Sequence, residues 1–319
     1  MAGFVYNVER MQIFFLVGPT AVGKSAVALQ LARRLNAEII SADSMQVYRG
    51  MDIGTAKPGA AERSQVLHHL IDVCDIMEPF DVKRFVDLAN EAIQDIRARK
   101  KTAVVAGGSG LYVRALRHGL FEGPSRNAQL RARLERRSAP ELFEELQRLD
   151  PVTARGIDRH NPRRLVRALE VLYETGMPIR ELQTQWDTDS AQRSAPAIGL
   201  TRERTDLDQR IDRRIDEQMA AGWVEEVRRL LPLGLEENTT AMQAAGYREL
   251  VAHARGDLSL ADAVALIKTR TWQLAKRQLT WFRREPRLQW IEIGREEQPS
   301  ETATRVCDVL HEQEKSSNR

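Results

Sequence analysis

IFFLVGPTAVGKSAVALQLARRL, residues 13–35, sets the architecture of this chain. A short apolar run at 13–17 is followed by a glycine-rich loop, GPTAVGKS at 18–25, and then by apolar residues at helical spacing. The spacing G-x-x-x-x-G-K-S is typical of a loop whose backbone N–H groups and lysine bind phosphate oxygens. The stretch therefore predicts a buried strand, a phosphate loop and a helix, without specifying which phosphate is bound.

Further strand candidates surround this unit. They are AEIISAD at 37–43, HHLIDV at 68–73, TAVVAGG at 102–108 and APAIGL at 195–200. The segment 81–100 has the pattern of a helix capped by Asp81. Alternating strands and helices favour an α/β fold, a P-loop-type parallel sheet flanked by helices, with its ligand at the carboxyl ends of the strands.

The composition and the pattern of the sequence change after residue 121. Residues 122–194 are charged and helical in pattern, with no clear strand, and more helical segments follow residue 200. We therefore expect a P-loop α/β core with C-terminal helices, made of 11–121 and 195–319, interrupted by a helical insertion domain at 122–194.

The bulk composition favours a cytoplasmic protein that has no membrane span. The 319 residues carry a net charge of +3, with 42% hydrophobic and 29% charged residues. No apolar run approaches the ~20 residues of a membrane helix, and the two cysteines have no metal-site spacing. Basic residues concentrate at 126–137 and 268–287, which indicates either a polyanion-binding surface or solvated helix faces.

Several polar residues are candidates for chemistry at the sheet edge. Asp43 follows a strand and is placed to accept a proton, while Gln46 has the paired donor and acceptor that read an adenine edge. In GGSG at 107–110, Ser109 replaces the acidic strand end with which nucleotide hydrolases hold a metal ion. The residues that a nucleotide hydrolase needs are thus only partly present. On sequence alone, GGSG is equally well explained as an ordinary tight turn.

Seven motifs together resemble the tRNA dimethylallyltransferase family, also called tRNA isopentenyltransferases. They are GPTAVGKS, ISADSMQVYRGMDIGTAKP, HHLID, GGSGLY, NPRRLVRALEV, GYREL and QLAKRQLTWFR, in family order from about residue 13 to 284. The resemblance implies transfer of a dimethylallyl group from its diphosphate to N6 of adenosine 37, next to the anticodon of tRNAs that read codons starting with U. The bound phosphates would then be an isoprenoid diphosphate.

The resemblance also implies roles for individual residues. Asp43 would be the general base, Ser109 would donate to the leaving diphosphate, and Ser25 would help to place Mg²⁺, directly or through water. Lys24 and Arg214 would supply positive charge. The diphosphate would bind to Gly18, Thr20, Ala21, Val22, Gly23, Lys24 and Ser25. The tRNA would contact Asp43, Ser44, Met45, Gln46, Ser109, Arg126, Arg163, Arg164, Arg167, Arg248, Arg270, Gln273, Lys276, Arg277 and Gln278.

Three positions depart from the family pattern. Ser109 stands where the family usually has threonine, Trp272 stands where an arginine is common, and Val22 replaces a small polar residue in the phosphate loop. The expected partners are the anticodon stem-loop of tRNA and dimethylallyl diphosphate, and we expect a monomer. A P-loop small-molecule kinase, a prenyltransferase acting on adenine nucleotides and a non-catalytic, nucleotide-switched RNA-binding module remain as alternatives.

Overall fold

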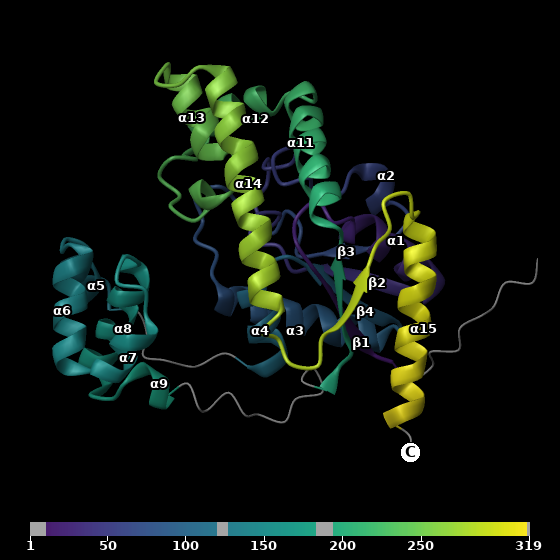
Figure 1. Cartoon of the computed structure of the whole chain (residues 1–319), viewed down its shortest axis with the longest axis horizontal. Helices are drawn as coiled ribbons and strands as arrows, with labels where there is room; N and C mark the ends of the chain where they lie inside the picture. The colour runs from purple at the N-terminus through teal and green to yellow at the C-terminus, as the bar shows by residue number, and fades with distance from the viewer. Residues whose placement is uncertain (1–10, 120–126, 183–193, 318–319) are drawn as a thin grey trace, which may run out of the picture. The chain divides into compact units, whose positions relative to one another are not determined.

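The computed structural model describes residues 11–119, 127–182 and 194–317 (Figure 1). The chain divides into two compact units, one made of 1–117 with 191–319 and the other of 118–190. The second unit falls in the region where the sequence predicts an insertion at 122–194.

The first unit is built on a six-stranded sheet whose strands pair in parallel, in the order β3-β2-β4-β1-β5-β6. The strands are β1 (Ile13–Val17), β2 (Ala37–Ser41), β3 (His68–His69), β4 (Thr102–Gly107), β5 (Ala197–Thr201) and β6 (Gln289–Glu292). The inner strands β1, β2 and β4 are almost completely buried, as expected for a parallel sheet covered on both faces.

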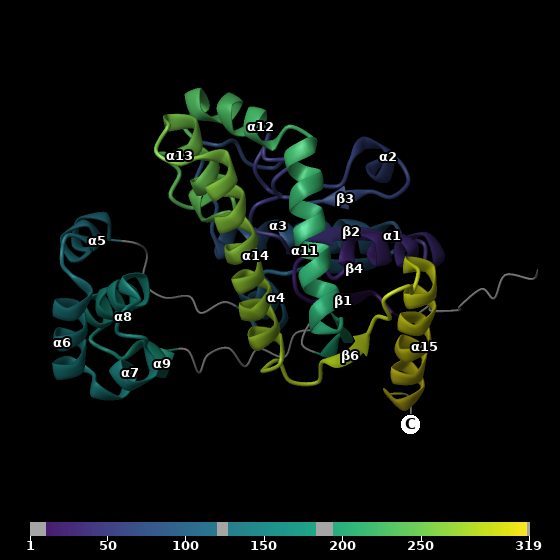
Figure 2. The ribbon, with the colours of Figure 1, turned by 45° about the horizontal axis from the view of Figure 1, so that its top comes forward.

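Helices connect and cover these strands. They are α1 (Lys24–Arg34), α2 (Ala60–Arg63), α3 (Val82–Ala98), α4 (Gly110–His118), α11 (Arg204–Ala220), α12 (Trp223–Leu230), α13 (Tyr247–Arg255), α14 (Leu260–Phe282) and α15 (Pro299–Ser317), with short 3₁₀ turns at Leu231–Leu233 and Ala241–Gln243. Helix α14 packs against both α11 and α13, and α15 packs against α1 (Figures 1 and 2). Within the described residues, no helix has the length and apolar character needed to cross a bilayer.

The register of the sheet brings three turns to one edge. Val17 at the end of β1 is level with Gly107 of β4 and with Gly199 of β5. The phosphate loop after β1 and the turn after β4 therefore begin side by side. Gly18 opens the phosphate loop with a φ of 152°, and a Cβ there would lie 2.5 Å from the carbonyl oxygen of Leu200, so only glycine allows this close approach.

Most of the predicted elements of the core are confirmed. The strands near 13, 37, 102 and 197 form, and the Asp81 side chain caps α3 by accepting the N–H of Arg84 at 3.0 Å. The strand predicted at 68–73 is largely wrong, because only His68–His69 pair and the backbone then turns left-handed at Leu70 and Asp72. Strand β6 was not predicted.

The second unit is a small helical bundle with its own core. Its described helices are α5 (Ala128–Glu135), α6 (Ala139–Leu149), α7 (Pro151–Gly156), α8 (Pro162–Thr175) and α9 (Ile179–Leu182). Leucines from α5, α6 and α8 form the buried cluster at its centre: Leu134, Leu142, Leu146, Leu165 and Leu169. This core is what apolar residues at helical spacing in a charged segment produce.

Candidate active site

A cavity lies at the carboxyl edge of the sheet, between the phosphate loop and the turns that follow β2 and β4. It encloses about 600 Å³, including space open to solvent. Its lining combines residues of the phosphate loop, the β2 and β4 ends, α11 and α14. The structure thus brings together seven sequence-predicted site residues: Thr20, Lys24, Ser25, Asp43, Gln46, Arg214 and Gln278.

Positively charged side chains contact the phosphate loop from inside the cavity. The Nζ of Lys24 donates a hydrogen bond to the carbonyl oxygen of Pro19 at 2.7 Å. Arg214, on α11, donates to the hydroxyl of Thr20 at 3.3 Å. These contacts bring two cations of distant sequence origin to one loop, as anion binding requires.

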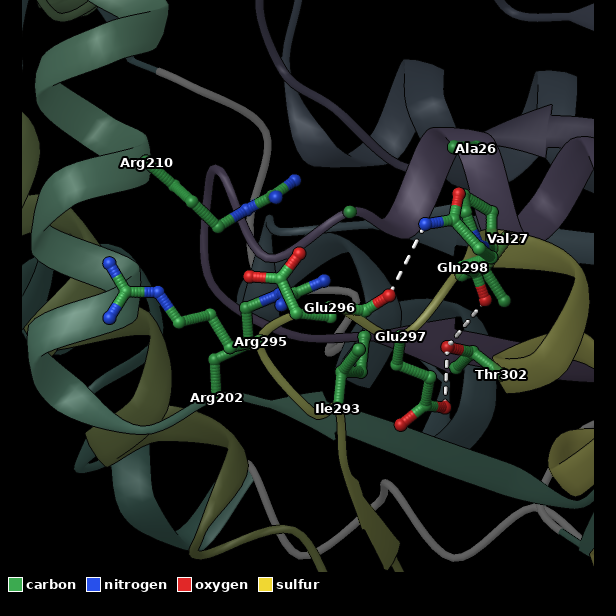
Figure 3. A pocket seen from close by; sticks show the side chains of 12 residues that line it. Ala26, Val27, Arg202, Arg210, Ile293, Arg295, Glu296, Glu297, Gln298 and Thr302 are labelled. Carbon is green, nitrogen blue, oxygen red and sulfur yellow. Dashed lines mark hydrogen bonds between the residues drawn. The ribbon is translucent and has the colours of Figure 1, made fainter.

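Two further arginines hold the loop from outside, and sequence reasoning missed both. Arg202 donates its Nε–H to the carbonyl of Val22, and Arg210 donates to the carbonyl of Ala21, each at 2.9 Å. They line a second pocket, which adjoins Gly23 (Figure 3). Arg210 could have been found, because it lies four residues before Arg214 and so on the same side of the helix.

Burial shifts the pKa values of Lys24 and Arg214. Removal from water lowers the pKa of Lys24 to about 7; the attraction of Asp43 opposes this shift and the repulsion of Arg214 adds to it. Burial likewise lowers the pKa of the Arg214 guanidinium, against the pull of Asp43. Asp43 is the one carboxylate among the described residues that line the cavity, so an anion entering it meets an excess of positive charge.

Asp43 and Ser109 are held together by the backbone of the β2 and β4 turns. One oxygen of Asp43 accepts the N–H groups of Met45 at 2.9 Å and of Gln46 at 3.4 Å. The hydroxyl of Ser109 accepts the N–H of Ser44 at 3.1 Å and lies 3.4 Å from the Ser44 hydroxyl. Asp43 thereby keeps its other carboxylate oxygen available to the cavity, since no hydrogen bond within the described chain engages it.

The amide of Gln46 is already engaged by the protein. Its Oε1 accepts from the hydroxyl of Ser41 at 2.9 Å, and its Nε2 donates to the carbonyls of Thr55 and Ala56 at 3.2 and 3.3 Å. Gln46 lines the cavity, but reading an adenine edge would require it to share or exchange these bonds. That role stays a prediction.

A buried carboxylate anchors the loop that follows Gln46, which sequence reasoning also missed. Glu226 of α12 accepts the backbone N–H groups of Asp52, Ile53 and Gly54 at 2.9, 2.6 and 3.2 Å. The hydroxyl of Tyr247 donates to the same carboxylate at 2.6 Å. This loop supplies the Thr55 and Ala56 carbonyls, so Glu226 fixes one wall of the cavity.

The predicted tRNA contacts of the first unit lie mostly outside the cavity. Arg248 on α13 is exposed, as are Gln273, Lys276 and Arg277 on α14. Arg270 forms an ion pair with the buried Glu249, so its charge is partly neutralised. Trp272 is half-buried against the core, with the Lys276 ammonium 5.4 Å from its ring centroid.

Gln278 differs from these neighbours, because it contacts the phosphate loop and the turn after β4. The remaining predicted contacts belong to the second unit or fall outside the described residues. Arg163 and Arg164 on α8 are exposed, and Arg167 pairs with the buried Glu170 at 2.8 Å. Arg126 lies outside the described residues.

Ser25 is the phosphate-loop side chain that could help to hold a magnesium ion. Ser25 is exposed and lines the cavity. No group of three or more His, Cys, Asp or Glu side chains suited to a metal gathers anywhere in the described chain. Mg²⁺ commonly keeps several waters and binds through few protein ligands plus substrate phosphates, which a serine hydroxyl at the phosphate loop allows.

Comparisons with known proteins agree on one family. The family model described as IPP transferase matches residues 46–285, more than half of the chain. The chain is 45% identical to tRNA dimethylallyltransferase 1 of Pelobacter propionicus, over 88% of this chain and 92% of that one. It is 44% identical to the tRNA dimethylallyltransferase of Geobacter metallireducens, over 89% and 93% of the two chains.

Solved structures lead to the same group. The crystal structure of the full-length tRNA isopentenylpyrophosphate transferase from Bacillus halodurans is similar with a TM-score of 0.70 and 37% identity, covering 96% of this chain and 99% of that one. A eukaryotic dimethylallyltransferase described as acting on tRNA gives a TM-score of 0.75 at 27% identity, covering 88% and 73%.

Proposed function

The chain belongs to the IPP transferase family, and we therefore propose that it transfers a dimethylallyl group from dimethylallyl diphosphate to N6 of adenosine 37 in tRNAs that read codons starting with U. The observation that carries the proposal is the convergence of Lys24, Arg214 and Asp43 on one cavity. Two cations suit a diphosphate, and a single carboxylate beside them suits a proton acceptor.

The reaction is a substitution at the allylic carbon. The N6 lone pair forms a bond to C1 of the dimethylallyl group, while the C1–O bond breaks and its electrons pass to the diphosphate. Asp43 accepts the proton that N6 loses. The charge that develops on the diphosphate is stabilised by Lys24, by Arg214 and by the backbone N–H groups of the phosphate loop.

Ser109 and magnesium would assist the leaving group. The Ser109 hydroxyl, adjacent to the Asp43 loop, would donate to the bridging oxygen in place of its contact with Ser44. Mg²⁺ would be held by Ser25 and the substrate phosphates, and would neutralise part of the diphosphate charge.

Part of the cavity wall suits an isoprenoid. Leu274 of α14 is the one large apolar side chain among the described lining residues, and Ala56 and Ala106 also line the cavity. An apolar five-carbon group gains by leaving water for such a surface. We place the dimethylallyl group against Leu274.

The tRNA would bind across the exposed basic residues of α13 and α14. Lys276 and Arg277 offer their charges to solvent, where the phosphates of an anticodon stem-loop can reach them. The protein would act in the cytoplasm, where tRNA is available, and as a monomer.

Incubation with labelled dimethylallyl diphosphate and unmodified tRNA tests the proposal. We expect label to appear in tRNA and nucleoside analysis to find it on N6 of adenosine 37. In a parallel arm, dimethylallyl diphosphate should protect the chain from heat more than ATP does. Label found on free adenine nucleotides alone, or ATP consumed instead, would favour one of the alternative enzymes.

A further inference from the structure

Gln278 joins the phosphate loop to the turn after β4. Its Oε1 accepts the backbone N–H of Thr20 at 2.8 Å, across 258 residues of sequence, and its Nε2 donates to the carbonyl of Gly108 at 3.0 Å. Both ends of one amide are therefore used to hold two loops at the cavity. The first loop would bind the diphosphate, and the second precedes Ser109.

The approach of Gln278 depends on a glycine. A Cβ at Gly108 would lie 2.4 Å from the Nε2 of Gln278, closer than real contacts allow, whereas its contact with the Gly18 carbonyl oxygen would be ordinary at 3.5 Å. The amide of Gln278 therefore occupies the space that a side chain at Gly108 would need. An alanine at this position would displace that amide and hardly disturb its other neighbours.

The orientation of α14 separates Gln278 from its basic neighbours. Successive helical residues are rotated by roughly 100°, so Lys276 lies about 200° away from Gln278 around the helix. Leu274, one turn earlier, lines the cavity together with Gln278, whereas Lys276 and Arg277 are exposed and do not line it. Gln278 thus belongs to the cavity face of the helix, although the sequence motif groups it with the tRNA-binding residues.

We propose that Gln278 is a positioning residue for the diphosphate: it holds the phosphate-loop backbone at Thr20 in the geometry that binds the leaving group, and it does not read tRNA. The inference rests on the proposed function for the identity of the substrates. Loss of Gln278 should leave the Thr20 N–H and the buried Gly108 carbonyl unpaired, and the loop should then relax away from its binding geometry.

Two single substitutions test this from opposite sides. Gln278→Met keeps the length and helix propensity of the side chain but removes both hydrogen bonds. Gly108→Ala keeps Gln278 and displaces its amide by the Cβ. For each we expect the KM for dimethylallyl diphosphate to rise about tenfold, the equivalent of losing roughly 1.4 kcal/mol of binding. The KM for tRNA and its salt dependence should change less than about twofold.

Gln94→Met provides a control, since it makes the same change at an exposed position of helix α3, outside the cavity and outside every predicted contact surface. It should leave the KM for dimethylallyl diphosphate at the parent value. A double variant, Gly108→Ala with Gln278→Ala, completes the cycle. Because truncation of Gln278 removes the group with which the Cβ clashes, the double variant should be no worse than Gln278→Ala alone.

Calorimetry with inorganic diphosphate, without tRNA, separates this inference from the proposed function. The parent chain should bind the probe, and Gln278→Met should bind it about tenfold more weakly, with an unchanged circular-dichroism spectrum confirming the fold. A raised tRNA KM with unchanged diphosphate affinity, an unaffected variant or an additive double variant would overturn the inference. A parent chain that binds diphosphate but does not modify tRNA would contradict the proposed function alone. If the parent chain did not bind diphosphate, both would be overturned.

Discussion

The Lys24 ammonium donates a hydrogen bond to the carbonyl oxygen of Pro19, within its own phosphate loop, at 2.7 Å. One backbone acceptor is a weak replacement for the water that burial removes, and the pKa of Lys24 is accordingly lowered to about 7 from an ordinary 10.5. A bound diphosphate would supply the opposite charge that this lysine lacks.

The first prediction concerns proton uptake. At pH 8 a lysine with a pKa near 7 is about nine-tenths neutral, and a bound diphosphate should restore its charge. Diphosphate binding at pH 8 should therefore take up close to one proton, to be measured by calorimetry in buffers of different ionisation enthalpy. Lys24→Ala should weaken diphosphate binding, abolish the uptake and leave tRNA affinity nearly unchanged. If Lys24→Ala took up as many protons as the parent chain, the proton would be bound by a group other than Lys24.

The same pKa shift has a consequence for folding. The lowered pKa means that between about pH 7 and 10.5 the unfolded chain holds the extra proton, so the contribution of Lys24 to stability rises with pH across this window. Lys24→Met should flatten that rise. Chemical denaturation of both proteins at pH 7 and pH 9 would measure the difference between their slopes.

The anchoring of the Asp52–Gly54 loop gives a third prediction. Glu226→Gln replaces one carboxylate oxygen with a donor that faces backbone N–H groups, so the free energy of unfolding should fall by about 2 kcal/mol or more. Tyr247→Phe removes only one hydrogen bond to the same carboxylate and should cost about 1 kcal/mol. Denaturant titration of both variants checks the order, which would be reversed if Tyr247 were the main anchor.

Exposed charges on α14 lead to a prediction about salt. Lys276→Gln with Arg277→Gln should raise the KM for tRNA, leave the saturating rate nearly unchanged and reduce the slope of log affinity against log salt by up to about two. Filter binding across a salt series gives this slope. If it did not change, the polyanion would be bound elsewhere on the chain.

A further prediction concerns the length of the isoprenoid. Leu274→Ala should remove the largest apolar group of the cavity wall and make room for the ten-carbon geranyl diphosphate. We expect the ratio of kcat/KM for geranyl over dimethylallyl diphosphate to rise by about tenfold or more, in line with methylene-sized discrimination. An unchanged ratio would place the end of the isoprenoid away from Leu274.

Local patterns in the sequence were sufficient for the phosphate loop and for most of the sheet. The spacing of GPTAVGKS, the apolar strands and the Asp81 cap are all short-range signals, and the structure confirms the elements that they predict. The prediction at 68–73 failed beyond His69, because the backbone turns left-handed at Leu70 and Asp72. Asp72 turns out of the strand to bind Lys57 and Arg63.

Contacts between residues far apart in the sequence explain why some residues of the site were not predicted. Gln278 was grouped with the basic residues around it, since nothing local reveals that its amide reaches Thr20. Arg202 and Glu226 act on backbone groups of distant loops, and a motif search does not detect such partners. Strand β6 is a short edge strand with one buried residue, too weak a pattern to distinguish from a loop.

Asp43→Asn tests whether Asp43 is the base of the reaction, since it preserves the shape of the side chain and an acceptor for the Met45 N–H but removes the basic group. Asp52→Asn is the matched control, an exposed acid in the loop that follows. Single-turnover transfer should be about 100-fold slower or more for Asp43→Asn, with tRNA and diphosphate affinities within several-fold of the parent, and close to the parent rate for Asp52→Asn. An Asp43→Asn variant that transfers at nearly the parent rate would show that Asp43 only positions the adenine, and that the proton leaves to water or to the departing diphosphate.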